Sequence, residues 1–440
     1  MKQKSIRFVK DYMIKKGFVL FFFYSFVFSQ DNLLLRQADT LTSSMIGEET
    51  ITRLDGNIIF QKKDIILKGS FATQSDKNSI INLYGDVSIQ QPEQIIYCDS
   101  LSFNNDTEFF EMYGNIKIKN GSRFISADKA TLDQISDQMT LIDNCEIKDE
   151  NSNKVFGDKI LLSFQDNALQ SFKVLSNGLI LSKNSGYEKI DDLEKSIENE
   201  DILKAETILA KLENDEIQNI ELIGMASTLI HLYNDSLYDG INEISGDKIT
   251  MNIQNESAKK LIAEGGTVGR YTPNASNENV QEEIDYEADR VEFEVDKKIS
   301  EMYGVVKVIH DKMDLSAAHI NVNWSNNILE AFSDNPFNKE EINRPVLIEN
   351  NREPMTGDTM VYNIKSRKGK VLMGESRVQE NVYMGSQITS VTDSTFYIDD
   401  CIFTSCDPSK FYLGSKQVKI IYGDKVIAKP LSIFIGGVPI

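Results

Sequence analysis

The chain has 440 residues, of which 41% are hydrophobic and 26% charged, and its formal net charge is −20. This composition is that of a folded protein and excludes a disordered chain. The acidity excludes nucleic acid as an expected partner, because nucleic-acid binding needs a basic patch. The length suggests two or three domains.

Residues 1–29 have the pattern of a secretory signal peptide. Basic residues from Lys2 to Lys16 precede the apolar run 17–27 (GFVLFFFYSFV). That run is too short for a spanning helix, which needs about 20 residues, and it suits the core of a signal peptide. We expect cleavage after Ser29 and export into the periplasm. An uncleaved anchor is the alternative. The first cysteine is Cys98, so no lipid-anchored N-terminus is expected.

A repeated strand pattern begins after residue 50. Its first element places a Gly before an apolar–polar alternation, as in 84–89 (YGDVSI), 113–118 (YGNIKI) and 303–308 (YGVVKV). Alternation of this kind predicts a β-strand with one apolar face. A Gly ahead of a strand indicates a bulge or a tight corner.

The second element is a small residue followed by Asp or Glu and then another alternation, as in 98–103 (CDSLSF) and 127–132 (ADKATL). An Asp bonds its own backbone locally, so the pair predicts a turn at the start of a strand. The recurring Asp residues are Asp99, Asp128, Asp158, Asp247, Asp289 and Asp358. They occur once per repeat, whereas calcium loops cluster several oxygens, so we expect no metal site and no cofactor.

A unit of two strands cannot bury its apolar face alone, so the repeats must stack. The sequence therefore predicts an all-β, elongated, antiparallel fold. Residues 184–201 (NSGYEKIDDLEKSIENED) are polar and acidic and lack alternation, which predicts a short helix, a flexible linker or an insertion. We expect a first block over 50–183 and a second over 202–440. The polar stretch 335–351 predicts an extended loop.

These repeats resemble the organic-solvent-tolerance (OstA-like) superfamily, the periplasmic domain shared by the lipopolysaccharide-transport proteins A, C and D (LptA, LptC, LptD). The Gly-Asp/Asn-Val/Ile strands and the Ala-Asp-Lys/Arg strands carry the resemblance. The stretches 403–408 (FTSCDP) and 423–430 (GDKVIAKP) are similar to the segment that leads into the outer-membrane barrel of the D component.

The resemblance implies an open, antiparallel repeat β-jellyroll whose inner face shelters lipid acyl chains. The implied partners are lipopolysaccharide, other OstA-like jellyrolls that dock by strand addition, and an outer-membrane barrel with its lipoprotein plug. The implied location is the periplasm or the periplasmic face of the outer membrane. No long series of ten-residue lipid-facing strands follows. The chain is then either part of a longer protein or a separate periplasmic piece.

Four cysteines in an exported chain permit disulfides, with three possible pairings that the sequence does not distinguish. Residues 403–408 occupy the family's threonine-cysteine motif. The resemblance therefore implies Cys406 as a disulfide candidate, with Cys401 second.

Alternation places the candidate lipid-binding residues on the inner face. They are Val87, Ile89, Leu101, Phe103, Ile116, Ile118, Leu132, Val291, Phe293, Val306 and Val308. The alternative is an ordinary closed core, which alternation does not separate from an open trough. No nucleophile elbow or phosphate loop is present, so we expect no enzyme. The rival functions are a structural or adhesive β-repeat protein and, less favoured, a carbohydrate-active β-helix.

Overall fold

The computed structural model describes residues 33–165, 168–190, 193–214, 216–254, 257–277, 280–335, 338–349, 352–378, 381–392, 394–405 and 410–440. The predicted signal peptide at 1–29 lies outside these ranges. The described residues form strands, turns and bends without a helix, so the all-β prediction is confirmed. Accordingly, no described segment is a helix of the length and apolarity needed to cross a membrane.

The first strands are β1 Leu34–Gln37, β2 Thr40–Ile46, β3 Glu49–Lys62, β4 Ile65–Ser75, β5 Ile80–Gln90, β6 Gln94–Asn104, β7 Phe109–Asn120, β8 Arg123–Asp133, β9 Gln138–Lys148 and β10 Lys154–Gln165. The next are β11 Ala168–Ile190, β12 Leu193–Glu213, β13 Glu216–Asn234, β14 Leu237–Gln254, β15 Ser257–Pro273, β16 Ile284–Glu294, β17 Ile299–His310, β18 Met313–Asn323, β19 Ile328–Phe332 and β20 Asp334–Asn335. The last are β21 Asn338–Ile342, β22 Val346–Glu349, β23 Met355–Thr356, β24 Thr359–Asn363, β25 Lys368–Val378, β26 Asn381–Thr392, β27 Thr395–Thr404, β28 Phe411–Ile421, β29 Lys425–Ile435 and β30 Val438–Pro439.

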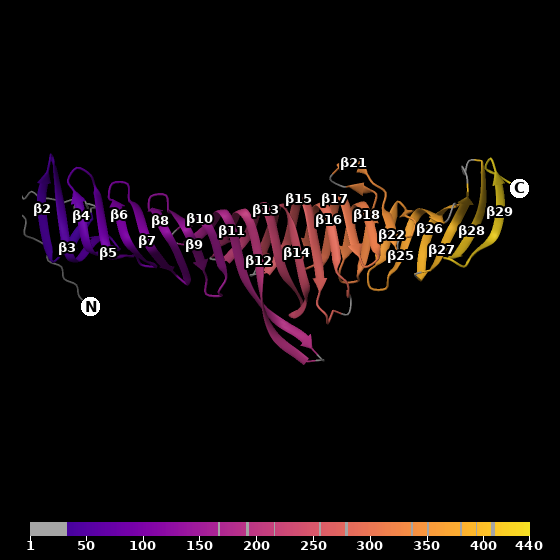
Figure 1. Ribbon diagram of the computed structural model, residues 1–440, viewed down its shortest axis with the longest axis horizontal. Coiled ribbons are helices and arrows are strands. Elements are labelled where there is room, and N and C mark those ends of the chain that lie inside the picture. Colours follow the sequence, from indigo (N-terminus) through magenta and orange to yellow (C-terminus); the bar gives the residue numbers. More distant parts are fainter. Residues whose placement is uncertain are drawn as a thin grey trace, which may run out of the picture.

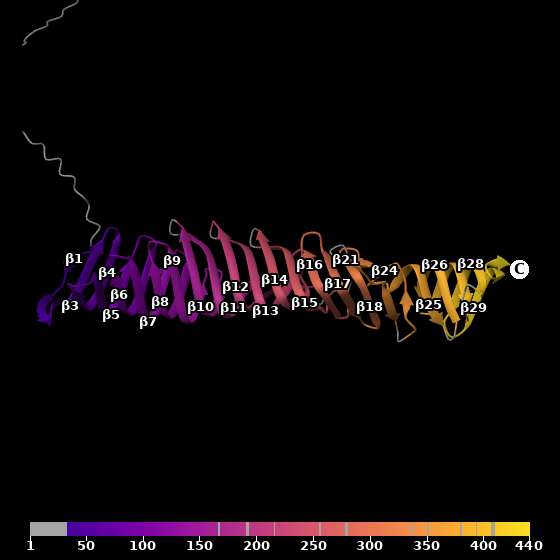
Figure 2. The ribbon, with the colours of Figure 1, turned by 90° about the horizontal axis from the view of Figure 1, so that it is seen from above.

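Twenty-eight of these strands form one sheet, in which most strands pair antiparallel with their neighbours in the chain. Figure 1 shows the result as a long row of strands that runs from β2 at one end to β29 at the other. Figure 2, the view from above, shows the same row as a narrow, gently twisting body. The predicted elongated, antiparallel architecture is confirmed.

Each long strand bends at a corner near its middle. In β6 the buried side chains are Gln94, Ile96 and Cys98, and then Leu101 and Phe103, so the alternation changes phase beside Asp99. The pairing of β6 with β7 is interrupted at the same place, between the pairs Tyr97–Lys117 and Ser100–Tyr113. A bulge of this kind bends a strand. Both halves of the strand therefore face one shared interior.

The corner is built from the two sequence elements acting together. Gly114 and Asn115 of β7 both have positive φ angles, of 74° and 46°, and Gly tolerates this conformation best. Asn115 Nδ2 donates to Asp99 Oδ2 on the neighbouring strand at 2.8 Å. A Cβ on Gly114 would collide with the Asp99 carboxylate. The predicted glycine bulge is confirmed, because the backbone needs it at this corner.

The prediction that Asp99 marks a turn at the start of a strand is wrong. Asp99 lies in the middle of β6, and Asp128 and Asp158 lie in the middle of β8 and β10. The same bond to a neighbouring Asn recurs at these corners, at 2.6 Å for Asn144–Asp128 and 2.7 Å for Asn177–Asp158. The repeated Asp therefore caps a bulge on the next strand.

The corners fold the sheet into two facing layers. We define layer A by the half-strand 116–120 of β7 and the halves in line with it, and layer B by the half-strand 109–113 and its counterparts. Opposite the corners, both layers end in hairpin turns, and an opening lies between them. Lys62 Nζ at the end of β3 in layer A contacts Glu108 Oε1 in a layer-B turn at 2.7 Å. This buried lysine closes the opening at that point.

The layers differ in length along the molecule. We define the narrow region as β3–β8 and the wide region as β11–β18. In the narrow region the half-strands are short. Strands such as β6 and β7 have 11 and 12 residues in total, and the corner divides them about equally between the two layers. In the wide region layer A reaches much farther, because β11 has 23 residues and β12 has 21. Layer A therefore overhangs layer B, and Figure 1 shows the β11–β12 hairpin projecting below the body.

The prediction of a short helix or a flexible linker at 184–201 is wrong for the described residues of that stretch. They form the outer halves of β11 and β12, which pair continuously from Gly178–Ala205 to Ile190–Leu193. Likewise, the extended loop predicted at 335–351 contains the small β20–β21 hairpin and β22, which pairs with β18. The division into two blocks at 50–183 and 202–440 stays a prediction.

Candidate functional site

A cavity of about 1330 Å³ lies between the two layers, mostly in the wide region, and extends past β10 and β9 to the start of β8. Its lining residues all lie between Ser122 and Asn327. Pockets for drug-sized ligands hold roughly 300–1,000 Å³. The cavity is therefore large enough for a ligand bigger than one small molecule.

The floor of the cavity is apolar. Both layers contribute: Phe172, Ile220 and Leu261 come from layer B, and Leu203 and Ile244 come from layer A. Long strands position them, because alternate side chains of β11 to β16 point between the layers. An apolar cavity of this kind gains free energy from any hydrocarbon that replaces water in it.

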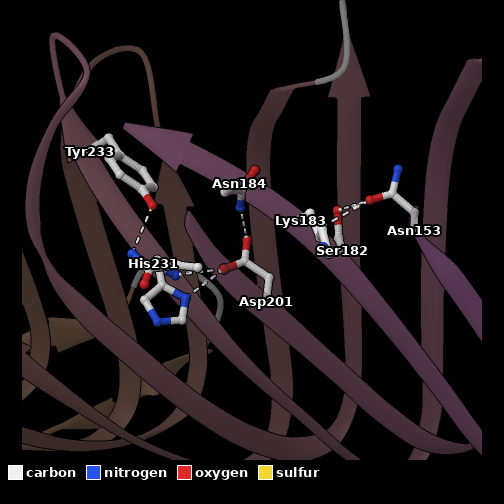
Figure 3. Close-up of polar contacts among 8 residues, drawn as sticks. Asn153, Ser182, Lys183, Asn184, Asp201, His231 and Tyr233 are labelled. Atoms are coloured by element: carbon white, nitrogen blue, oxygen red, sulfur yellow. Dashed lines mark hydrogen bonds and ion pairs between the residues drawn. The ribbon is translucent and has the colours of Figure 1, made fainter. Parts of the chain in front are cut away.

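The overhang of layer A adds a polar wall to the cavity, which we define as Asn184, Asp201, His231 and Tyr233. Beyond the pair Ile202–Leu229, β12 separates from β13. Asp201 bridges the split, because its Oδ1 accepts from the His231 backbone N–H at 2.8 Å and lies 3.0 Å from His231 Nδ1. Asn184 Nδ2 donates to Asp201 Oδ2, and Asn199 Nδ2 donates to the Tyr233 hydroxyl at 2.9 Å. Figure 3 shows Asn184 and His231 in contact with Asp201, with Tyr233 nearby.

A second group of polar contacts holds the neighbouring strand ends. Asn153 Oδ1 accepts from Ser182 Oγ at 3.2 Å and from the Lys183 backbone N–H at 2.9 Å, as Figure 3 also shows. The Tyr271 hydroxyl lies 3.0 Å from Asp239 Oδ2. Burial raises the pKa of Tyr271, so its phenol stays protonated and serves as a donor to Asp239.

Electrostatically the cavity is acidic. Burial raises the pKa of Asp201, although its hydrogen bonds with His231 and Asn184 act in the opposite direction. The basic lining residues are Arg123, Lys183 and Lys298. The acidic ones are Asp149, Glu150, Glu198, Asp201, Glu216 and Asp239. Carboxyl groups thus outnumber basic groups two to one. Among the residues that the structure describes, no group of three or more His, Cys, Asp or Glu could hold a metal ion.

The structure places the predicted lipid-binding residues inside the fold, but mostly outside the cavity. Val87, Ile89, Leu101, Phe103, Ile116, Ile118, Leu132, Val306 and Val308 are buried in the continuous core. Val291 and Phe293 line the cavity. Burial in a core does not establish lipid binding, so the assignment stays a prediction for all of them, with the cavity favouring the last two.

Sequence reasoning missed most of the cavity lining, including Phe172, Leu203, Ile244 and the polar wall. One signal was available: the steps from Asp158 to Glu206 and from Glu206 to Asp247 are 48 and 41 residues, longer than the two preceding steps of 29 and 30 residues. A longer step means longer half-strands between corners. That signal locates the overhang, although it does not reveal a cavity beside it.

The disulfide candidates are only partly described. Cys401 is a buried free thiol, as are Cys98 and Cys145. Burial raises the pKa of Cys98 to about 12 and those of Cys145 and Cys401 to about 11, which keeps all three protonated at neutral pH. Cys406 lies outside the described residues, so a disulfide at that position stays a prediction.

Comparison with known proteins identifies the first third of the chain. Residues 30–164 match the family described as OstA-like protein. This segment is therefore similar to an OstA-like domain. It includes the whole narrow region and ends before the wide region begins.

Among solved structures, the chain is similar to LptH from Pseudomonas aeruginosa. LptH is described as the LptA homologous periplasmic component of the conserved lipopolysaccharide transport device. The two share 11% sequence identity at a TM-score of 0.26, over 34% of this chain and 93% of LptH. No curated protein matches the chain in sequence.

Proposed function

We propose that the protein is a periplasmic component of lipopolysaccharide transport, which holds the acyl chains of the lipid in the wide region. The cavity of about 1330 Å³ is the observation that carries this proposal, together with the OstA-like domain that precedes it. Each methylene that moves from water into an apolar site contributes about 0.8 kcal/mol. A long apolar floor therefore binds acyl chains through their length, without specific chemistry.

The overhang supports lateral loading of the cavity. Layer B ends early in the wide region, so the opening there is bordered on one side only by the long strands of layer A. A lipid can insert its chains between the layers while its head group stays near the hairpin ends. The narrow region lacks this asymmetry and is closed at Lys62 and Glu108.

The two ends of the sheet support docking to partner jellyrolls. At one end, Leu41 and Met45 of β2 are 58% and 78% exposed. At the other, Leu431 and Ile433 of β29 are 56% and 44% exposed. Apolar edge strands of this kind pair with strands of another protein. The proposed partners are other OstA-like jellyrolls and, at the β29 end, an outer-membrane barrel of the D type with its lipoprotein plug.

The direct test is to purify the full chain from an envelope extract and to quantify the fatty acids that copurify with it. The variant Ala258→Phe adds a large side chain to the cavity lining and should reduce the bound fatty acids several-fold. The matched control is Ala38→Phe near the far end of the sheet, which should leave them unchanged. A lipid-free wild-type protein that also takes up no added lipopolysaccharide would favour the rival function, a structural β-repeat protein.

A further inference from the structure

The polar wall presents fixed hydrogen-bonding groups to the cavity. Asp201 is held by three donors, from the His231 backbone, the His231 ring and Asn184. Its position is therefore set before any ligand arrives. This preorganisation favours binding, because little side-chain entropy remains to be lost.

Two groups of the wall are still available for a ligand. The Tyr233 hydroxyl accepts from Asn199, and its own proton has no acceptor among the described residues. The Nδ1 atom of His231 faces Asp201, and its Nε2 makes no hydrogen bond with a described residue. A phenol that donates and an imidazole nitrogen that donates or accepts are both suited to a hydroxyl group.

Charge argues against an anionic ligand at this place. Asp201 is the charged group at the centre of the wall, and the cavity has twice as many acidic as basic lining residues. A phosphate here would be repelled, because like charges at close range disfavour binding. An uncharged hydroxyl-rich group meets no such penalty.

The wall also carries aromatic faces. These are the rings of Tyr233 and His231, which lie 5.9 and 6.0 Å, centroid to centroid, from the Tyr238 ring outside the cavity lining. Aromatic rings combine an apolar face with a polar edge. They therefore complement a ligand that is itself apolar on its ring faces and polar at its rim, as a pyranose is.

We propose that the polar wall is a subsite for an uncharged glycan, which lies next to the acyl chains of the same amphiphile. This assignment rests on the proposed function, since it requires that acyl chains occupy the neighbouring floor. It adds that the sugar, and not a phosphate, is the part of the head group that enters the cavity.

The test compares three surfactants with the same dodecyl chain and different head groups. The full chain is titrated with dodecyl maltoside, octaethylene glycol dodecyl ether and dodecyl phosphate, each below its critical micelle concentration, by isothermal calorimetry. Wild type should bind the maltoside most tightly and the phosphate least. Tyr233→Phe should weaken the maltoside about threefold to tenfold, the effect of one hydrogen bond, and leave the ether unchanged.

Two further variants sharpen the result. Tyr238→Phe, which removes a neighbouring phenol outside the cavity lining, should change neither affinity. Asp201→Asn should tighten the phosphate relative to the maltoside. Thermal denaturation confirms that each variant is folded.

The outcomes separate the two proposals. Equal binding of all three surfactants, or an equal loss for maltoside and ether in Tyr233→Phe, would overturn the glycan subsite and leave the lipid cavity in place. Tighter binding of the phosphate would also overturn it. Absence of binding by all three would overturn the proposed function and the subsite with it.

Discussion

The narrow and wide regions share one corner and differ in what lies between their layers. At Gly114 and at Gly224 the backbone has a similar positive φ, 74° and 79°, opposite an acidic side chain of the preceding strand. Yet the narrow region is filled by its own side chains, whereas the wide region encloses a large cavity. The long strands β11–β15, and not the repeat itself, therefore mark the hollow segment, although β16 and β17 also line the cavity with only 11 and 12 residues each.

The two regions also differ in whether the OstA-like family model matches them. The OstA-like match covers residues 30–164 and so includes the packed segment. Most of the cavity lining lies beyond it, and the part within it consists of Ser122, Arg123 and residues between 147 and 155. The family pattern thus describes the corner and the stacking, while the features that distinguish this chain lie in its long strands.

The largest expected difference between the regions is the effect of removing a buried ring. Phe103 is fully buried and stacks on Phe110, with 4.3 Å between centroids. Phe103→Ala should lower the free energy of unfolding by about 3–5 kcal/mol. Phe172→Ala should cost clearly less, because Phe172 already borders empty space. Urea denaturation of both variants measures this, and equal costs would mean that the wide region is packed as tightly as the narrow one.

Overpacking should show the converse. Ala130 in the narrow region has no exposed surface, so Ala130→Phe should destabilise the protein by about 1–3 kcal/mol. Ala258→Phe in the wide region should leave stability nearly unchanged, because the ring can extend into the cavity. Thermal unfolding compares the two. A large loss of stability in Ala258→Phe would indicate that the cavity wall does not tolerate added volume.

The shared corner should respond alike in both regions. Gly114→Ala and Gly224→Ala each place a Cβ at positive φ against an acidic side chain of the neighbouring strand. Strain of this kind costs of order 1–3 kcal/mol, and we expect the two losses to agree within experimental error. Denaturant unfolding of both variants checks this. A loss confined to one region would mean that the corners are not equivalent.

The smallest expected effect is a dependence on pH that arises outside the narrow region, since all three histidines follow residue 230. Burial lowers the pKa of His319 below its ordinary value of 6.5. The unfolded chain then binds the proton more tightly than the folded one. Stability is therefore complete above pH 6.5 and decreases as the pH falls below it.

His319→Phe tests this dependence. The His319 ring is stacked between Tyr303 and Phe332, at 4.7 and 5.2 Å, so a phenyl ring can replace it. The variant should lose less stability than wild type between pH 7.5 and 5.5, as measured by urea denaturation. Parallel pH profiles for the two proteins would assign the acid sensitivity to other groups.

Much of the fold could be predicted, because the alternation of apolar and polar residues along a strand shows which side chains point to the interior. Ile116 and Ile118 occupy every second position of a short strand, and both are buried as expected. The Gly before them indicated a bulge for the right physical reason. The partner of that bulge was harder to find, because Asp99 acts on a neighbouring strand and a sequence does not show which strands are neighbours.

The candidate site could not be predicted in the same way. On β12 the alternate residues Asn199, Asp201 and Leu203 lie on one strand, but two of them are polar and conceal the period. Apolar–polar alternation identifies a strand only where the side chains of its inner face are apolar. Strands that form a polar wall inside a cavity therefore have the composition of a linker. For this reason the sequence predicted a linker at residues 184–201, where the structure has paired strands.

The most direct test of the hollow wide region is photocrosslinking at two matched isoleucines. A photoreactive residue replaces Ile244 in the cavity lining or Ile116 in the packed narrow region, with exposed Val268 as a surface control, and each variant is irradiated with purified lipopolysaccharide. We predict a strong adduct at position 244, a clearly weaker one at 116 and background levels at 268. Equal adducts at 244 and 116, or an adduct at 116 alone, would contradict the account.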